Sequence, residues 1–359
     1  MNNLDSKEVY EKPPYLKAFS IIREYVNDLL RGINAGKKVD LSIDSIGSVA
    51  LIRVGGSGII CDVAAELFSR AGINVRTVRS YEVNFRDCDL AIAVSHSGNT
   101  AEAIKPVLSL MEHRVKCVFI TSGGILGEVA RKFRIPTVFT RRDVPSRYDF
   151  PSMLGAMLGI MEKLGMKQVS VDLKEIREFQ SKICEDKAVE KNPAKNLAIR
   201  IVKAKPPIIY VYERVRNAGY RLKCQLNENS KIYCGFAEIP EALHNDIEGL
   251  PPESLIILPR SFRESSEMTE TIEAFIRFMG EGRCVSIMVD SKNELNELLQ
   301  LFLFMDYTSL YAAVLKKVDP LTVPRVSKLR NVNKLYSEIL GKKAGIFRKL
   351  SQVMPSPTL

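Results

Sequence analysis

A short segment rich in hydroxyl groups is the first place where the sequence could do chemistry. Ser95, Ser97 and Thr100 follow the unbroken apolar run 90–94 and precede an amphipathic helical pattern. A strand that turns into a helix in this way presents unpaired N–H groups and the positive end of the helix dipole. Ordinary N-capping by one hydroxyl is the alternative, but three hydroxyls in one turn favour an anion site for a phosphate.

A glycine-rich turn, Gly55-Gly-Ser-Gly58, follows an earlier predicted strand. Cys61 stands where a dinucleotide fingerprint requires its third glycine, and the next strand does not end in an acidic residue. We therefore expect the backbone of this turn to approach a smaller anion, to which Ser57 adds a hydroxyl. A tight turn that simply needs glycine is the alternative.

Two further residues have the chemistry of proton transfer. Glu228 falls at the end of a predicted helix among polar neighbours, where a carboxylate can act as a general base. His244 is one of only three histidines, and an imidazole exchanges a proton near neutral pH. Taken alone, a solvated helix-end charge and an ordinary loop histidine are the alternatives.

The elements around these residues alternate between strand and helix. Strands are predicted at 49–54, 74–78, 90–94, 116–120, 136–140, 207–211, 232–236, 254–258 and 283–289. This alternation predicts an α/β fold with two doubly wound parallel sheets flanked by helices, which bind ligands beyond the carboxyl ends of their strands. The predicted organisation is an N-terminal helical segment 1–40, a phosphate-binding subdomain 41–166, a second subdomain 167–325 and a basic helical tail 326–359.

Several helical patterns flank the predicted strands. One spans residues 15–32, another spans 218–228, and a third spans 293–313 with an expected break near Asp306. The tail carries a basic amphipathic pattern over 339–354, and we interpret its charges as a solvated helix face.

The composition predicts a cytoplasmic protein without a membrane segment. Of its 359 residues, 46% are hydrophobic, no apolar run approaches the roughly 20 residues of a membrane span, and the N-terminus is polar. The seven scattered cysteines indicate reduced thiols, and three histidines with no ligand spacing indicate no metal site. Because the net charge of +10 is dispersed, it favours an anionic small substrate over nucleic acid.

The order of these motifs resembles the bifunctional phosphoglucose/phosphomannose isomerases of the sugar isomerase (SIS) superfamily. The matching motifs are Gly-Gly-Ser-Gly, Ser-x-Ser-Gly-Asn-Thr-x-Glu, Pro-x-Arg, Asn-Glu-Asn-x-Lys and Pro-Glu-x-x-His-Asn-x-Ile-x-Gly, over roughly residues 45–330. Residues 308–320 also resemble the family's C-terminal helix and Asp-Pro break. The resemblance implies two SIS-type subdomains in a homodimer. It also implies isomerisation of glucose 6-phosphate and mannose 6-phosphate to fructose 6-phosphate, in glycolysis and gluconeogenesis, without metal or cofactor.

The resemblance also implies a role for each matching residue. The residues that would hold the sugar 6-phosphate are Gly56, Ser57, Ser95, Ser97 and Thr100. Glu228 would move a proton between C1 and C2 through a cis-enediol, and His244, reaching the site from a partner subunit, would assist ring opening. Arg147 would stabilise the negative charge of the enediol intermediate.

Three departures from the family pattern keep other functions open. At the position of the family's C-terminal lysine stands Arg330, with Lys328 two residues earlier, and both are candidates for its role. Arg147 is followed by Tyr-Asp-Phe-Pro where the family usually continues Ala-Leu-Gly, and the tail beyond residue 330 is longer. The alternatives are an isomerase for another phosphosugar, such as an amino or N-acyl sugar phosphate, and a non-catalytic SIS module that senses a sugar phosphate.

Overall fold

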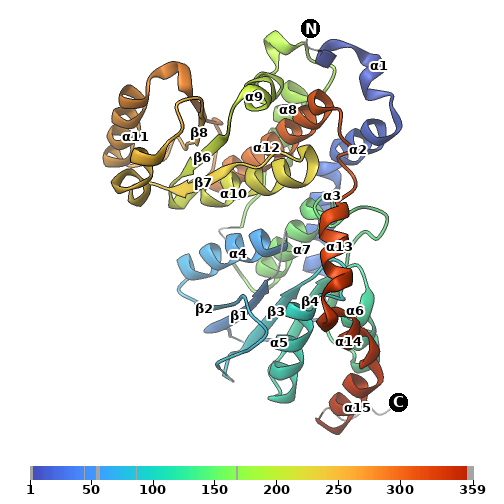
Figure 1. The fold of residues 1–359 in the computed structure, drawn as a ribbon. Helices are drawn as coiled ribbons and strands as arrows, with labels where there is room; N and C mark the ends of the chain where they lie inside the picture. The colour runs from blue at the N-terminus through green and yellow to red at the C-terminus, as the bar shows by residue number, and fades with distance from the viewer. Residues whose placement is uncertain (1–2, 44, 54–56, 86, 167–168, 354–359) are drawn as a thin grey trace. The chain divides into compact units, whose positions relative to one another are not determined.

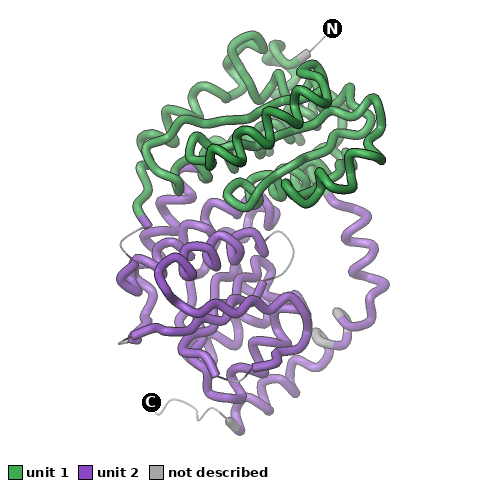
Figure 2. The backbone as a smooth tube through the Cα atoms, turned by 90° about the vertical axis from the view of Figure 1, so that its left-hand side faces the viewer, with its two compact units in different colours: residues 1–24, 170–322 green, residues 25–169, 323–359 purple. Residues whose placement is uncertain are grey.

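The structure, a computed structural model, consists of two compact units. It describes residues 3–43, 45–53, 57–85, 87–166 and 169–353. Unit 1 comprises residues 1–24 and 170–322, and unit 2 comprises residues 25–169 and 323–359 (Figure 2). The division after residue 169 lies close to the expected subdomain boundary, whereas the segment predicted as 1–40 is shared between both units.

Unit 2 contains a five-stranded parallel sheet in the order β2-β1-β3-β4-β5 (Figure 1). Its strands are β1 (Ser48–Arg53), β2 (Asn74–Val78), β3 (Leu90–Val94), β4 (Cys117–Thr121) and β5 (Thr137–Phe139). Every residue of β3 and β4 is buried, because helices cover both faces of the sheet. The strand order reverses between β1 and β3, which is the point at which sheets of this order bind their ligands.

The helices of unit 2 lie on both faces of this sheet. They are α3 (Tyr25–Lys37), α4 (Gly58–Arg70), α5 (Ala101–Glu112), α6 (Gly124–Phe133), α7 (Phe150–Lys163), α13 (Pro324–Val332), α14 (Lys334–Gly341) and α15 (Lys343–Val353). The side chains of Ala91, Ala93 and Phe119 share one core cluster with α5 and α6. Helices α3 and α7 cross so closely that a Cβ on Gly32 would lie 2.1 Å from the Ser152 carbonyl oxygen, so only glycine fits there.

The C-terminal tail contains α13, α14 and α15, and the single helix predicted over 339–354 is divided between α14 and α15. Leu350 is 1% exposed and belongs to the core cluster around α5, and the ring of Phe347 stacks on Phe133 with centroids 6.3 Å apart. Lys349 pairs with Glu112 of α5 at 2.6 Å. The amphipathic pattern predicted for this segment is confirmed in α15: one side of the helix packs on the core, whereas Arg348 and Lys349 are exposed.

Unit 1 contains a four-stranded parallel sheet in the order β7-β6-β8-β9. Its strands are β6 (Pro207–Val211), β7 (Gly235–Glu238), β8 (Leu255–Pro259) and β9 (Cys284–Ile287). Tyr210 of β6 points to a helix on one face and contacts the ring of Phe275 at 5.1 Å, while Val211 points to Gly219 of a helix on the other. The predicted α/β class with parallel sheets is confirmed.

One long core helix dominates the helical layer of unit 1. The helices are α1 (Lys7–Tyr10), α2 (Pro13–Arg23), α8 (Leu173–Ile183), α9 (Pro193–Lys203), α10 (Arg216–Gln225), α11 (Ser266–Met279) and α12 (Glu294–Lys316). Two helix predictions are wrong. The pattern 15–32 is split between α2 and α3 at Glu24, and α12 continues through Asp306 because that carboxylate accepts hydrogen bonds from Arg221 at 2.6 Å and Gln225 at 2.8 Å.

Among the described residues, α12 is the one helix whose length and apolar composition would allow it to cross a membrane. However, 94% of the apolar 18-residue stretch of this helix is buried inside the protein, as expected for the core helix of a globular unit.

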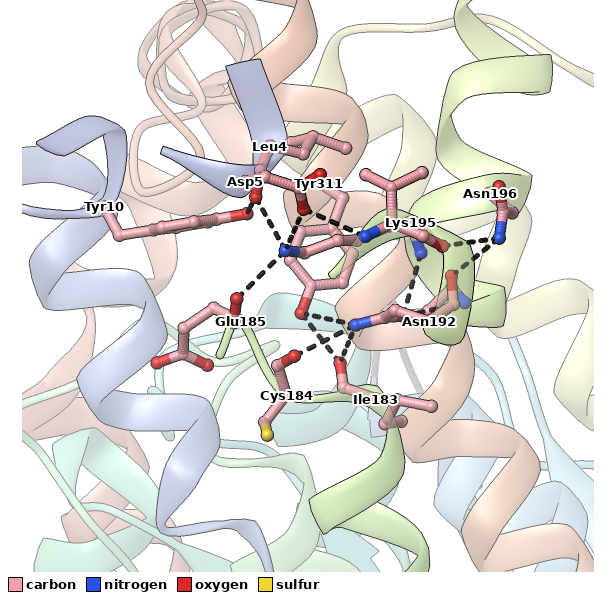
Figure 3. A network of polar contacts seen from close by, with 12 residues as sticks. Leu4, Asp5, Tyr10, Ile183, Cys184, Glu185, Asn192, Lys195, Asn196 and Tyr311 are labelled. Atoms are coloured by element: carbon pink, nitrogen blue, oxygen red, sulfur yellow. Dashed lines mark hydrogen bonds and ion pairs between the residues drawn. The ribbon is translucent and has the colours of Figure 1, made fainter. Parts of the chain in front are cut away.

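A buried lysine anchors the N-terminal segment within unit 1 (Figure 3). The Lys195 side chain is 1% exposed, and its Nζ donates to the backbone oxygens of Leu4 at 2.6 Å and Glu185 at 2.9 Å. It also lies 3.3 Å from the Asp5 carboxylate. Burial lowers the pKa of Lys195, but three acceptors match the three donors of its ammonium, which indicates a structural role.

Candidate functional site

The serine turn, residues 95–100, joins the carboxyl end of β3 to α5 in unit 2. Its hydroxyls face one another: Ser95 Oγ donates to Thr100 Oγ1 at 3.2 Å, and Ser97 Oγ lies 3.4 Å from the same oxygen. Thr100 is the N-cap residue of α5, yet its side chain makes no capping hydrogen bond within the described part of the chain. Simple N-capping by Thr100 therefore does not account for the hydroxyl cluster, whose position at the end of a central strand suits an anion.

Neighbouring backbone holds the serine turn in place. Gly98 has φ +63°, and a Cβ there would lie 1.8 Å from the Gly123 carbonyl oxygen, so glycine is required. The Asn99 side-chain oxygen accepts a hydrogen bond from the Ile125 N–H at 3.0 Å, at the start of α6. The turn is thus held against two successive strand ends, and within it the Asn99 N–H donates to Ser97 Oγ at 3.3 Å.

Of the glycine-rich turn, Ser57 and Gly58 are described, at the start of α4, the helix that follows β1; β1 is the strand next to β3. Ser57 occupies the N-cap position of α4, is 4% exposed and lies with its hydroxyl 4.0 Å from Met153 Sδ. Gly56 falls outside the described residues. Because β1 and β3 are parallel neighbours, Ser57 follows the same edge of the sheet as the serine turn.

Arg147 lies in the segment between β5 and α7 of the same unit. Arg147 is 7% exposed, and its guanidinium carbon lies 5.0 Å from the centre of the Tyr148 ring. Such packing limits the conformations of the guanidinium and leaves it a weakly hydrated cation.

Two residues that the sequence analysis missed lie beside the serine turn. His96 Nε2 lies 2.8 Å from the Arg141 carbonyl oxygen and 3.5 Å from Asp149 Oδ2. Asp149 is fully buried, and burial raises its pKa to about 7. The available signals were a histidine inside the hydroxyl-rich turn and an aspartate where the sequence departs from the family pattern.

In unit 1, Glu228 lies in a π-helical turn, Leu226–Ser230, that ends α10. Two buried hydrogen bonds attach this turn to Ser309 of the core helix α12: Asn229 Nδ2 donates to Ser309 Oγ at 2.9 Å, and Ser230 Oγ donates to the Ser309 carbonyl at 2.7 Å. Single π turns inside helices occur frequently at functional sites. Glu228 itself remains half-buried at the surface of this supported turn.

His244 is exposed and ends a short 3-10 helix, Glu241–His244, after β7. Strands β6 and β7 are parallel, so α10 and its π turn carry the chain back to the amino edge of the sheet. Glu228 therefore lies at the amino edge of β7, and His244 follows its carboxyl edge. Unit 1 of a single chain does not bring these two side chains together.

The remaining candidates, Lys328 and Arg330, are exposed on α13 in unit 2. Among the described residues, no group of three or more His, Cys, Asp or Glu side chains could hold a metal ion. Within one unit, the structure brings together Ser95, Ser97 and Thr100, whereas Glu228 and His244 belong to the other unit.

Comparison with known proteins identifies related chains. Residues 190–332 match the family model of the bacterial phospho-glucose isomerase C-terminal SIS domain. A bifunctional phosphoglucose/phosphomannose isomerase from Pyrobaculum aerophilum is 29% identical over 290 residues, which cover 80% of this chain and 88% of the relative. A D-glucosamine-6-phosphate 4-epimerase from Sulfolobus acidocaldarius is 31% identical over 201 residues, 56% of this chain and 63% of that one.

A solved structure supports the fold independently. A glucose-6-phosphate isomerase like protein from Thermus thermophilus superposes with a TM-score of 0.62 at 18% identity, and the match covers 93% of this chain and 100% of that one. At this identity the likeness shows the fold alone. The matched family model and the relatives along most of the chain confirm the resemblance seen in the sequence: residues 190–332 match an SIS domain, and the chain is similar over most of its length to bifunctional phosphoglucose/phosphomannose isomerases.

Proposed function

We propose that this protein is an aldose–ketose isomerase that interconverts glucose 6-phosphate and mannose 6-phosphate with fructose 6-phosphate. The observation that carries the proposal is the cluster of three mutually facing hydroxyls in the serine turn, at the strand end where such sheets bind anions. The names of the relatives from Pyrobaculum aerophilum and Aquifex aeolicus support the choice of substrates.

In this proposal the phosphate positions the sugar for chemistry elsewhere on the molecule. The residues that bind it are Gly56, Ser57, Ser95, Ser97 and Thr100. Because the phosphate does not change during the reaction, its binding energy serves to hold C1 and C2 in a reactive orientation. A turn fixed by Gly98 and Asn99 suits this task, since it need not reorganise when the ligand arrives.

Glu228 is the proposed base. It removes the proton from C2 of the open-chain aldose while the carbonyl oxygen at C1 gains a proton, which gives a cis-enediol. The proton on Glu228 is then returned to C1 while the hydroxyl on C2 releases its proton, which gives the ketose. Arg147 stabilises the negative charge that develops on the enediol oxygens. The attachment of the π turn to Ser309 supports this role, because a general base must be held at hydrogen-bond reach of a carbon-bound proton.

His244 is the proposed proton-transfer group for ring opening, contributed by the second subunit of a homodimer. The positions of Glu228 and His244 at opposite edges of β7 support this arrangement, since one copy of the unit keeps them apart. Lys328 or Arg330 takes the part of the family's C-terminal lysine, and alanine variants of each, compared by kcat, distinguish the two.

The primary test compares Glu228→Gln with Glu253→Gln, an exposed carboxylate on the same unit, in a coupled assay with glucose 6-phosphate and mannose 6-phosphate. Loss of a general base is expected to lower kcat by about 10²- to 10⁴-fold, with the control unchanged. In D2O, glucose 6-phosphate recovered from the wild-type reaction should carry deuterium at C2. Equal rates for wild type and Glu228→Gln would exclude Glu228 as the base.

Subunit mixing tests the shared site. Glu228→Gln and His244→Ala homodimers are each expected to be inactive, but a mixed dimer would contain one intact pair of Glu228 and His244. Random mixing should therefore restore about a quarter of the wild-type activity, as expected for an isologous dimer with shared sites. If both residues served the same subunit, mixing would restore none.

A second candidate substrate class is an amino sugar phosphate. The 31% identity to a D-glucosamine-6-phosphate 4-epimerase favours it, as do the residues after Arg147 that depart from the isomerase pattern. Incubation with glucosamine 6-phosphate, followed by proton NMR of the sugar, tests this alternative directly. Binding of sugar phosphates without turnover of any of them would instead support a sensor.

A further inference from the structure

A buried histidine and a buried aspartate meet behind the serine turn. His96 lies in the chain between Ser95 and Ser97, and its side chain is 10% exposed. Its Nε2 lies 2.8 Å from the Arg141 carbonyl oxygen, which can only accept, so the neutral ring carries its hydrogen on Nε2. The same nitrogen lies 3.5 Å from Asp149 Oδ2, so His96 faces two acceptors with a single N–H donor.

Asp149 follows Arg147 by two residues and begins α7 as its N-cap residue. It is 0% exposed, and neither of its carboxyl oxygens has a hydrogen-bond partner among the described residues. A buried ionised carboxylate in such a place is costly, so the residue gains from holding a proton. Burial raises the pKa of Asp149 to about 7. The hydroxyls of Thr140 and Ser152 and the Arg141 N–H oppose this effect, whereas the negative charge of Asp28 adds to it.

Most of the charged side chains around His96 and Asp149 form ion pairs with one another. The charged and titratable side chains on the segments next to Asp149 include His96, Asp28, Arg31, Arg141, Arg142, Asp143 and Arg147. Farther along the helices packed on α7, Lys37 pairs with Glu162, and α4 carries Asp62, Glu66 and Arg70. Arg141 donates to Asp28 at 2.9 Å and to Asp143 at 2.7 Å, and Arg31 pairs with Asp28 as well. Burial lowers the pKa of His96, which keeps its ring neutral at pH 7. The ionisation of Asp149 is thus the main change of charge in this region near neutral pH.

We propose that His96 and Asp149 form a proton-holding pair that positions the serine turn and links it to the Arg147 segment, so that the turn binds phosphate best while Asp149 is protonated. The proposal rests on the proposed function only in taking the serine turn as the phosphate site. His96 and Asp149 are positioning residues, since the hydroxyls and Arg147 are the groups assigned to the ligand. Neither residue is among the positions at which the sequence matches the family.

The affinity of the serine turn for phosphate is expected to fall as the pH rises. When Asp149 loses its proton, its carboxylate attracts the Nε2–H of His96 away from the Arg141 carbonyl, and a negative charge appears behind a turn that receives a phosphate dianion. Both effects weaken binding as the pH rises through 7. One buried charge acting on a dianion across part of a unit corresponds to a change in affinity of about three- to tenfold.

The first test observes the pair without ligand and without catalysis. The chain has only three histidines, so ¹⁵N NMR of the histidine rings in the full-length protein resolves His96, assigned by its loss in His96→Gln. In the wild type, the His96 ring should keep its Nε2–H tautomer and change its chemical shift with a midpoint near pH 7. In Asp149→Asn this change should disappear, and a His96 signal that titrates identically in both proteins would overturn the pairing.

The second test measures the link to the turn with inorganic phosphate as the probe. Its dissociation constant is measured by calorimetry at pH 6 and pH 8.5 for wild type and Asp149→Asn, so that the ionisation of phosphate itself cancels in the ratio. We expect similar affinities at pH 6 and a wild type that is about three- to tenfold weaker at pH 8.5. A ratio that stays constant with pH would overturn the link, whether or not the protein isomerises a sugar.

In the same experiment, His96→Gln is the control for the conformation of the turn, because the Gln amide can still donate to the Arg141 carbonyl. His96→Leu removes the N–H that faces the ionised carboxylate and should move the midpoint of the phosphate-binding profile to higher pH. A profile that superimposes on that of the wild type would show that His96 does not act on Asp149. Inactivity of the wild type toward all hexose phosphates would refute the proposed function and leave both binding results standing.

Discussion

The buried carboxyl of Asp149 makes a prediction about stability that can be worked out in free energy. Its pKa is raised from an ordinary value of 3.8 to about 7, so the folded protein holds a proton that the unfolded chain releases. The contribution of this group to stability is fully present below about pH 4 and is lost as the pH rises through 7. At about 1.36 kcal/mol for each pH unit between the two values, the loss amounts to at most ~4 kcal/mol.

Asp149→Asn preserves the shape of the side chain and removes the ionisation. Relative to wild type, the variant should therefore gain stability between pH 4.5 and pH 8.5, by about 2 to 4 kcal/mol. Urea unfolding followed by circular dichroism is the suitable assay, because the chain contains no tryptophan. Asp290→Asn, at an exposed carboxylate, is the control and should not show this gain.

The result that refutes this reasoning is a difference between Asp149→Asn and wild type that is the same at both pH values. It would mean that Asp149 ionises with an ordinary pKa despite its burial, through a donor that stabilises the carboxylate. The His96 Nε2–H is the donor to examine in that case, because it lies 3.5 Å from Oδ2. A Gln at position 96 would then destabilise the protein more at pH 8.5 than at pH 4.5.

Three further predictions concern packing and support. Gly155→Leu should destabilise unit 2 by more than about 2 kcal/mol in thermal unfolding, because a Cβ there would lie 2.2 Å from a backbone oxygen of α3, whereas Gly345→Ala, with nothing within 4 Å, should not. Ser309→Ala removes the acceptor of the Asn229 side chain and should lower kcat about 10-fold with little change in KM. Lys195→Met leaves two buried backbone acceptors and the Asp5 carboxylate without their donor and should cost about 2 to 4 kcal/mol, measured by urea unfolding.

The strands and the serine turn were predictable because their signals are local. The run Leu90–Val94 is apolar at every position and forms β3, and the polar residues after it form the turn that the pattern indicates. Some observed strand boundaries differ from the predicted ones by a few residues, because side-chain type does not determine where the last hydrogen bond of a sheet forms. Strand β7, for example, is predicted at 232–236 and is found at Gly235–Glu238.

Other features depend on partners far away in the sequence. The π turn at Glu228 is stabilised by Ser309, 80 residues beyond Asn229, so no window around α10 could reveal it. Likewise, Asp306 in α12 indicates a helix break when read locally, but Arg221 and Gln225 satisfy its carboxylate inside the core. The same holds for Asp149, whose burial is set by packing and not by its neighbours in sequence.

The two halves of the proposed reaction are supported in physically different ways. The serine turn is held mainly by contacts to the start of α6, through the close approach of Gly98 and the side chain of Asn99. The turn of Glu228 instead depends on side-chain hydrogen bonds, those of Asn229 and Ser230 to Ser309 and those of Lys231 to backbone carbonyls. Removing one hydroxyl with Ser95→Ala should therefore raise KM and leave kcat nearly unchanged, while Ser309→Ala does the reverse. A protein that only senses a sugar phosphate would require the support of the serine turn but not the support of Glu228.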